Sequence, residues 1–194
     1  MDSSTNMLYM AIGDNGVLVE STYRIGKKDH AKHVVDRIDQ LLKRKDLTIN
    51  DIDRIYIGSG PGSYTGLRII GMVAKMLAYT KNIELYEVSS LYFLASGYDY
   101  IVAPMIDARN NNVFSGIYDH DHTLVNDALR TTKDFQALAV QFNAKPVLIN
   151  DVQYEVNIQN IMNMSTKVTE VHKFVPNYLR KTEAEQNLWL ERLH

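Results

Sequence analysis

The sequence predicts an α/β protein with two lobes, each built around a mixed sheet flanked by helices. The prediction rests on two short polar turns, Asp14-Asn15-Gly16 and Asn110-Asn111-Asn112, which each separate two strand-like runs. Helical stretches follow both of these hairpins. The repeated order indicates a duplicated architecture with a cleft between the halves. We place the first lobe at residues 1–98 and a shorter second lobe at residues 99–194.

The first lobe is expected to alternate strands with helices. Residues 30–44 carry apolar side chains at helical spacing, which is typical of an amphipathic helix. Residues 52–58 are typical of a buried strand, and they lead into a glycine-rich turn. Ser89 and Ser90 are both suitable N-caps for a short helix. The other predicted elements of this lobe are strands at 7–12, 17–24 and 83–88 and a helix at 67–79.

The second lobe is expected to begin with a hairpin of its own. An apolar run at 100–106 is followed by the asparagine turn and by a second strand at 113–118. Asp107 and Arg109 stand at this turn, where short polar side chains bond to local backbone groups, so we expect them to stabilise the hairpin. Helices are predicted at 134–142 and 183–193, and a buried strand at 147–150.

Composition narrows the class of protein. A chain of 194 residues with 45% apolar content can bury a substantial core. The net charge of −2 argues against a protein that binds nucleic acid by itself, because such domains usually carry a basic stripe. There is no cysteine, and the opening MDSSTNMLYM has neither a basic start nor a long apolar stretch. We therefore expect a cytoplasmic protein without a membrane partner.

The stretch GSGPGSYTG poses the question of a phosphate-binding loop. Glycines before a helix allow backbone N–H groups to approach an anion closely. The Lys and Ser/Thr of a Walker loop are absent after Gly66, however, and Ser63 takes the third glycine position of a dinucleotide fingerprint. The alternative is a sharp strand-to-helix turn, which we favour. Its predicted structural residues are Gly58, Gly60, Pro61, Gly62, Ser63, Thr65 and Gly66.

The helix after this turn carries small residues at a regular spacing. Gly71, Ala74 and Ala78 recur at three and four residues, beside Met76. Small residues so spaced permit another helix to approach closely, and we predict a partner interface of Gly71, Ala74, Met76 and Ala78. Close packing on the protein's own sheet is the alternative, because a layered α/β domain also needs small residues there.

No catalytic residue and no metal site is predicted. His30 and His33 lie three residues apart and are expected on a polar helix face. His120 and His122 alternate with aspartates, but we expect them in a solvated hairpin turn. Ser63 does not stand in the G-x-S-x-G elbow of serine hydrolases.

Four stretches together resemble the TsaB (YeaZ) family of tRNA threonylcarbamoyladenosine biosynthesis proteins. GSGPGSYTGLRI is similar to the family signature, and MDSSTNMLYMAIGDNG to its opening Asp-Thr-Ser/Thr hairpin. MIDARNNNVFSGIYD resembles the Asp-Ala-Arg hairpin, and PNYLRKTEAE the closing Tyr-Leu-Arg segment. The resemblance spans nearly the whole chain. It implies lobes of the actin, Hsp70 and sugar-kinase type, which are related to ribonuclease H.

The resemblance also implies a subunit that is not an enzyme alone and holds no cofactor. A TsaD-like partner would transfer the threonylcarbamoyl group to N6 of adenosine beside the anticodon, in tRNAs that read ANN codons. A TsaE-like ATPase would complete the machinery, tRNA would be bound only through the complex, and a homodimer is a further arrangement. The catalytic relative holds its metal with two histidines four residues apart, and Ser90 and Leu94 stand at these positions here. The alternatives are a glycoprotease-like peptidase or a nucleotide-dependent small-molecule kinase.

The sequence departs from the family pattern at two places. Asp2 follows Met1 directly, whereas the family's opening Asp follows a buried strand, so an upstream start and a lost strand both stay open. Asn112 stands where the family has an acidic residue three positions after its Arg.

Overall fold

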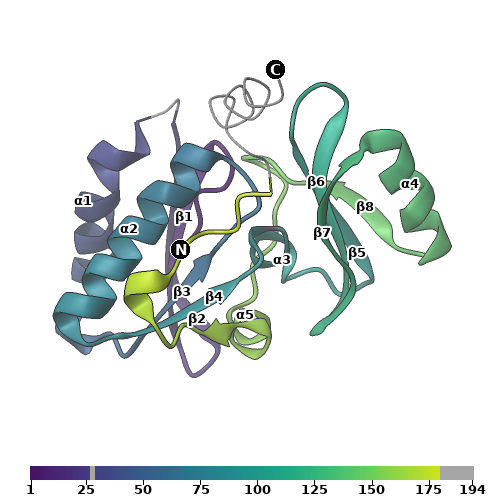
Figure 1. The fold of residues 1–194 in the computed structure, drawn as a ribbon. Helices are drawn as coiled ribbons and strands as arrows, with labels where there is room; N and C mark the ends of the chain where they lie inside the picture. Colours follow the sequence, from purple (N-terminus) through teal and green to yellow (C-terminus); the bar gives the residue numbers. More distant parts are fainter. Residues whose placement is uncertain (27–28, 180–194) are drawn as a thin grey trace, which may run out of the picture.

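Two lobes lie side by side in the computed structural model, which describes residues 1–26 and 29–179 (Figure 1). The first lobe begins with the antiparallel hairpin of β1 (Met7–Asp14) and β2 (Val17–Ile25). Asn15 and Gly16 connect the two strands with φ angles of 49° and 83°. Positive φ angles at both central residues are typical of a hairpin turn, which is why Asn-Gly predicted this element.

A second sheet in the first lobe is formed by β3 (Arg54–Gly58), β4 (Glu84–Val88) and β9 (Thr166–Lys167), in the order β3-β4-β9. The strands β3 and β4 are parallel, and β9 is antiparallel to β4. A short 3-10 helix, η1 (Ile49–Asp51), precedes β3, and Thr48 and Asp51 form a capping box at its N-terminus.

Helices cover both faces of the first-lobe strands (Figure 1). On one face lie α1 (His30–Lys43) and α2 (Tyr64–Lys81), which pack against Leu8, Met10, Ile55 and other buried residues. On the other face lie α3 (Ser90–Ala95) and α5 (Ile158–Met164). Successive residues of β1 alternate between the two cores, because side chains along a strand point to opposite faces.

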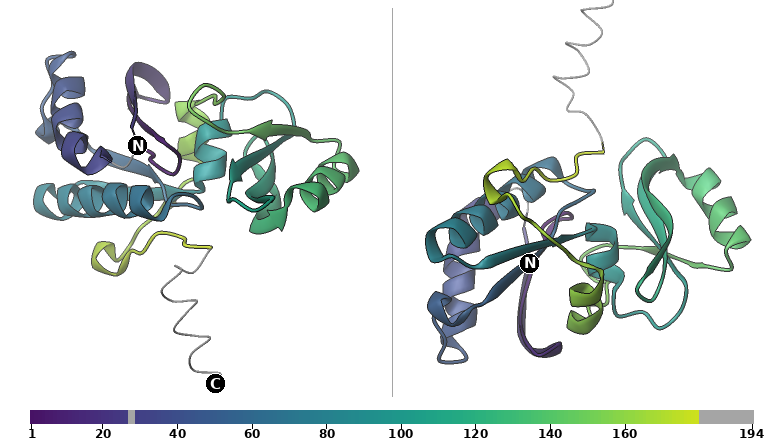
Figure 2. Two further views of the ribbon diagram at one scale, coloured as in Figure 1. Left: turned by 90° about the horizontal axis from the view of Figure 1, so that it is seen from above. Right: turned by 60° about the horizontal axis from the view of Figure 1, so that its bottom comes forward.

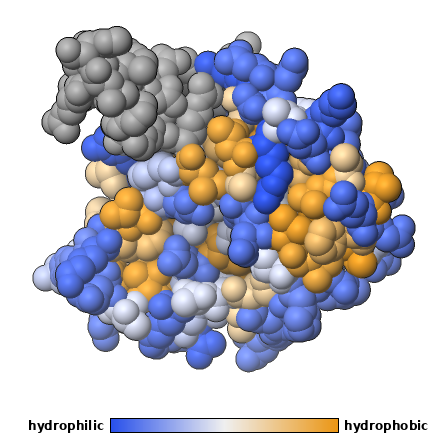
Figure 3. Space-filling model, turned by 45° about the vertical axis from the view of Figure 1, so that its right-hand side comes forward, coloured by the Kyte–Doolittle hydropathy of each residue, from blue (hydrophilic) through white to orange (hydrophobic). Residues whose placement is uncertain are grey.

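The second lobe has one sheet, in the order β7-β6-β5-β8. Its strands are β5 (Val102–Asp107), β6 (Asn112–Asp119), β7 (His122–Thr131) and β8 (Lys145–Leu148), of which β8 is parallel to β5. One face is covered by α4 (Thr132–Gln141), whose Phe135 and Ala139 are fully buried. The other face packs against α3, which therefore lies between the lobes. Figure 3 brings forward the side of the molecule on which the second lobe lies, and apolar side chains form separate patches there among polar ones.

The predicted class, α/β with mixed sheets flanked by helices, is confirmed, but the chain runs differently after residue 150. The residues that follow β8 return to the first lobe, where α5 contacts β2, β9 extends the sheet, and η2 (Val171–Lys173) lies against α2 (Figure 2). The predicted second lobe at 99–194 thus contains a segment that packs on the first. The helix predicted at 183–193 lies outside the described residues. None of the described helices is long and apolar enough to cross a membrane.

Candidate functional site

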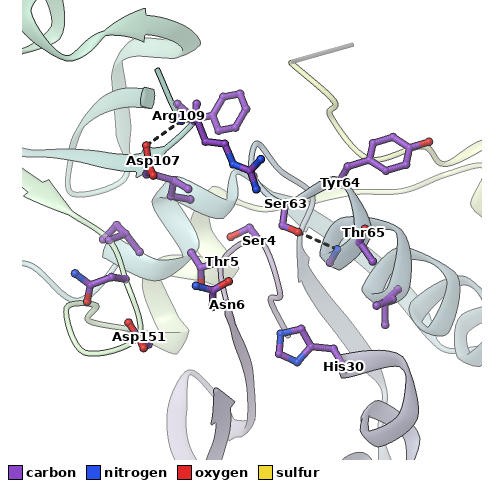
Figure 4. A pocket seen from close by; sticks show the side chains of 18 of the residues that line it. Ser4, Thr5, Asn6, His30, Ser63, Tyr64, Thr65, Asp107, Arg109 and Asp151 are labelled. Carbon is purple, nitrogen blue, oxygen red and sulfur yellow. Dashed lines mark hydrogen bonds between the residues drawn. The ribbon is translucent and has the colours of Figure 1, made fainter. Parts of the chain in front are cut away.

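A cavity of about 590 Å³ lies between the two lobes (Figure 4). The first lobe contributes residues 4–6, His30 and the first turn of α2. The second lobe contributes residues 106–109, at the end of β5, and residues 149–151, which follow β8. The cleft predicted from the sequence is therefore present, and most of its walls are loops and helix starts.

The glycine-rich turn packs against the opening residues of the same chain. A Cβ atom on Gly66 would overlap the carbonyl oxygen of Ser3, and one on Gly58 would overlap the carboxylate of Asp2. A Cβ atom on Gly62 would lie 2.5 Å from the Cβ of Ser4. The space that three of the glycines leave is thus occupied by residues 2–4.

The carboxylate of Asp2 is buried at the centre of this contact. Its Oδ1 accepts hydrogen bonds from the backbone N–H of Ser4 at 2.8 Å and from the Ser4 hydroxyl at 2.7 Å. Its Oδ2 accepts the hydroxyl of Ser90 at 2.6 Å, and that hydroxyl accepts the N–H of Gly60 at 2.9 Å. Burial raises the pKa of Asp2, against the opposing effect of these hydrogen bonds. The group connects the opening turn, the glycine turn and α3.

The remaining residues of the glycine turn shape the start of α2. Ser63 caps the helix, because its hydroxyl accepts the N–H of Gly66 at 3.3 Å. Pro61 is buried after a cis peptide bond, and Thr65 is exposed at the cleft. Gly60 has a φ angle of 111°, a region that favours glycine, and its missing side chain admits the carbonyl group of Asn177.

His30 is placed differently from the prediction. We expected it on a polar helix face with His33, but His30 is 5% exposed, whereas the side chain of His33 is 41% exposed. Neither ring nitrogen of His30 has a hydrogen-bond partner among the described residues. Burial lowers the pKa of this imidazole and favours its neutral form. The first residue of a helix carries no periodic signal, so the sequence could not reveal this burial.

Asp107 and Arg109 lie on the second-lobe wall of the cleft. The N–H of Arg109 donates to Asp107 Oδ1 at 2.9 Å, which is the local turn bond that we expected of Asp107. Arg109 has a φ angle of 65° and is exposed. Its guanidinium group extends across the cleft toward Ser63 in Figure 4.

The small-residue stripe of α2 is buried within this chain, which corrects its expected place on the surface. Gly71, Ala74 and Ala78 are all buried. Phe174, which follows η2, packs in the same core, and a Cβ atom on Gly71 would lie 3.2 Å from Pro176. Of the four residues predicted for a partner interface, Met76 alone is exposed, at 48%.

The segment that covers this stripe is fixed at several points, and we call residues 171–178 the strap. Lys75 Nζ donates to the carbonyl oxygens of His172 and Phe174, at 2.8 and 3.0 Å. The ring of Tyr178 packs against that of Tyr64 at a centroid distance of 4.6 Å, with the two ring planes tilted by 37°. The strap therefore takes the place that we expected for a helix of a partner.

A second polar cluster, which the sequence did not indicate, joins the lobes. The hydroxyl of Tyr118 on β6 donates to Asp127 Oδ1 on β7 and lies 3.0 Å from the hydroxyl of Ser89, the N-cap of α3. Burial raises the pKa of Asp127, and it raises the pKa of Tyr118 well above its usual value. Only the folded chain brings these three residues together.

The histidines of the β6–β7 turn do not converge. The Nδ1 atoms of His120 and His122 each lie 2.7 Å from a carboxylate oxygen of the preceding aspartate, and both side chains are exposed. Within the described ranges, no three His, Asp or Glu side chains are grouped so that they could hold a metal ion. The prediction of a solvated turn at this place is confirmed.

Comparisons with known proteins agree with this architecture. A family model described as "TsaD: tRNA N6-adenosine threonylcarbamoyltransferase" matches residues 22–154. The chain is 28% identical to the Bacillus subtilis (strain 168) protein named "tRNA threonylcarbamoyladenosine biosynthesis protein TsaB", over 98% of this chain and 96% of that one. It is 27% identical to the Escherichia coli (strain K12) protein of the same name, over 62% of this chain and 54% of that one.

A solved structure gives the same fold. The Pseudomonas aeruginosa protein described as having "similarity to peptidase YEAZ" superposes with a TM-score of 0.73 at 23% identity, over 92% of this chain and 97% of that one. This likeness shows that the two chains share one fold along almost their whole lengths.

Proposed function

The chain belongs to the TsaB (YeaZ) family, and on this basis we propose that it is a subunit of a tRNA threonylcarbamoyltransferase complex without catalytic activity of its own. Its role is to support a TsaD-like subunit, which modifies N6 of adenosine beside the anticodon in tRNAs that read ANN codons. Relatives that align with 98% and 62% of this chain are named as tRNA threonylcarbamoyladenosine biosynthesis proteins, which supports the pathway.

The observation that carries the non-catalytic role is the state of Ser90 and Leu94. These residues stand where the catalytic relative is expected to hold its metal with two histidines. The Ser90 hydroxyl is engaged by Asp2 and by the N–H of Gly60, and Leu94 is 0% exposed in the core. A hydroxyl that is already bonded and an aliphatic side chain offer a metal ion none of the usual ligands.

The outer face of α2 is the surface that we assign to the partner. Met72, Met76 and Tyr79 follow each other at four and three residues, so they share one side of the helix. They are 62%, 48% and 67% exposed. Methionine and aromatic side chains are enriched at protein interfaces. The partner interface therefore moves from the small residues to this neighbouring face, which a TsaD-like helix or a second copy of the chain could cover.

The remaining partners follow from charge and from the family. With a net charge of −2 the chain lacks the basic excess of a protein that binds tRNA alone, so tRNA is reached through the complex. A TsaE-like ATPase completes the machinery, and the site of action is the cytoplasm.

A reconstituted modification assay tests the role. Purified TsaD-like and TsaE-like subunits of the same organism are incubated with threonylcarbamoyl-adenylate and tRNA, with and without this chain. We expect modified adenosine only when the chain is present together with the TsaD-like subunit. Modification by the chain alone, or full modification in its absence, would contradict the proposal.

Met76→Glu tests the surface. A charge placed in an apolar contact must be desolvated without a partner, so we expect at least ~10-fold weaker binding to the TsaD-like subunit, or ~1.4 kcal/mol. The matched control is Val140→Glu on α4, at a residue that is 79% exposed. Equal affinities of the two variants in titration calorimetry would remove this face from the interface.

A further inference from the structure

The cavity between the lobes holds polar groups that the proposed function does not use. Its volume of about 590 Å³ falls in the usual range of small-molecule sites, ~300–1,000 Å³. Its walls come from the start of α2, from the first residue of α1, and from the residues that end β5 and follow β8. A cavity of this size can enclose a small ligand, and its unpartnered polar groups indicate which kind.

His30 is the first of these groups. It is 5% exposed, yet neither of its ring nitrogens has a hydrogen-bond partner within the described ranges. The backbone of Asn6 lies near the ring, but its carbonyl oxygen accepts the N–H of Gly26 at 3.1 Å. Figure 4 shows the imidazole directed from α1 into the cavity, below Thr5 and Asn6. Buried polar groups are normally paired, so this ring indicates a ligand.

The start of α2 offers backbone donors to the same cavity. The first N–H groups of a helix have no partner within it, and the helix dipole adds roughly half a positive charge there. Ser63 accepts the N–H of Gly66, whereas the N–H groups of Tyr64 and Thr65 have no partner in the part of the chain that the structure describes. Both residues line the cavity. An anionic group placed here would therefore meet two free donors.

Arg109 closes the site from the second lobe. Its guanidinium group extends toward Ser63, and it forms no ion pair with any side chain of residues 1–26 and 29–179. The bond from its N–H to Asp107 holds the backbone from which this side chain starts. A guanidinium group binds a carboxylate through two parallel hydrogen bonds. The start of α2 and Arg109 thus face each other across the place of one anionic group.

The charges around the cavity determine which anion fits. Of the described residues that line it, Arg109 has the one cationic side chain, whereas Asp107 and Asp151 contribute two carboxylates. A polyphosphate with three or four negative charges would be repelled by this balance. The glycines that would admit its phosphate groups are also in contact with residues 2–4. A single carboxylate is compatible with the site, above all in a molecule that presents a positive group to the two aspartates.

His30 defines the chemistry at the other end of the ligand. Burial lowers the pKa of its imidazole, and the charge of Arg24 lowers it further, so the ring is neutral. A neutral imidazole has one N–H donor and one acceptor nitrogen. A hydroxyl or a carboxamide group satisfies both kinds of nitrogen, because each of these groups can donate and accept. An aliphatic end would leave the buried nitrogens unpaired.

We propose that the cleft binds a free amino acid with an uncharged polar side chain. Its carboxylate lies between the start of α2 and Arg109, its ammonium group faces the carboxylates of the second-lobe wall, and its side-chain hydroxyl or carboxamide group bonds to His30. The inference goes beyond the proposed function and does not depend on it, since binding is measured on the isolated chain.

Titration calorimetry of the isolated chain tests the ligand class. The probes are L-threonine and L-glutamine, which differ in the length of their polar side chains, and the carboxamide derivatives of both, which lack the carboxylate. At least one of the two amino acids should bind with a Kd of ~1 mM or tighter, and at least ~10-fold more tightly than its own carboxamide. The proposal is overturned if neither amino acid gives saturable binding, or if the carboxamides bind equally well. Tighter binding of ATP than of both amino acids would also overturn it.

Two variants test the placement of the ligand. Arg109→Gln removes an exposed charge without disturbing the core, and it should weaken binding at least ~10-fold at an unchanged melting temperature, whereas Arg44→Gln on the far side of α1 should not. His30→Phe keeps a buried ring and removes both nitrogens, so it should weaken binding without lowering the melting temperature. His33→Phe is its control, because that side chain is 41% exposed. Full affinity in Arg109→Gln, or in folded His30→Phe, would contradict the assigned site.

Discussion

Replacing Phe174 with alanine should detach the strap from α2. Phe174 is 7% exposed and packs in the core that contains Ala74 and Ala78. Truncation of a buried phenylalanine costs ~3–5 kcal/mol, and we expect the lower end, about 3 kcal/mol, because a surface segment can settle into part of the vacated space. In a domain of this size each kcal/mol lowers the melting temperature by ~2–4 °C, so the expected drop is about 6–12 °C.

The neighbouring residue supplies the control for this measurement. Val175 belongs to the same strap but is 67% exposed, so Val175→Ala should change stability by no more than ~0.5 kcal/mol. Both variants are compared by differential scanning calorimetry, with hydrogen exchange of residues 171–178 as a local readout. A drop below ~2 °C for Phe174→Ala, or equal drops for both variants, would refute the idea that Phe174 anchors the strap.

Three further predictions concern the core, the second hairpin and the link between the lobes. Ala74→Leu should destabilise the isolated chain by ~1–3 kcal/mol in thermal unfolding, because Ala74 is 0% exposed and a larger side chain would overpack the core. An unchanged melting temperature together with lost partner binding would instead indicate that Ala74 contacts the partner. Asp107→Ala should lower the melting temperature, because it removes the hydrogen bond that Asp107 accepts from the Arg109 N–H, whereas Arg109→Ala keeps this bond and should change the melting temperature little. A larger drop for Arg109→Ala than for Asp107→Ala in calorimetry would contradict this interpretation of the turn. Burial raises the pKa of Asp127 in the folded chain, so protonated Asp127 stabilises the fold fully at low pH, and this contribution is lost as pH rises from the pKa of Asp127 in the unfolded chain to that in the folded chain. Asp127→Asn, which does not ionise, should therefore gain stability relative to the natural chain over this pH range, and parallel pH profiles of the two chains in urea unfolding would contradict this prediction.

The sequence predicted correctly those elements whose turn residues, or whose spacing of apolar side chains, match their place in the fold. The Asn15-Gly16 turn fixed the first hairpin, and the apolar spacing of residues 30–44 gave α1. By contrast, β7 was missed because it is an edge strand with mostly exposed residues, so alternation of apolar and polar side chains is weak. The seven-residue helix α5 has Ile161 as its one buried residue, and a single apolar position defines no period.

The candidate site was less predictable because long-range contacts decide it. The small residues of α2 indicated close packing. The sequence around Ala74 could not show whether the packing partner is a helix of another subunit or Phe174, which follows a hundred residues later in the same chain. The contact of the Tyr118–Asp127 pair with Ser89 likewise depends on how the two lobes meet. In both cases the type of side chain is known from the sequence, but the residue that it contacts in the folded protein is not.

The glycine turn joins the opening residues and the strap. Ser63 donates its N–H to the carbonyl of Ser4 at 2.6 Å, and the carbonyl of Ser59 accepts the N–H of Asn177 at 2.7 Å. A side chain on Gly66 would displace Ser3, and with it the turn that carries Asp2. A glycine substitution here would thus disturb the lobe at two places far apart in sequence. A displaced backbone would abolish activity through lost partner binding, just as the loss of a ligand contact would. Loss of activity in such a variant therefore identifies a ligand contact only when the melting temperature is unchanged.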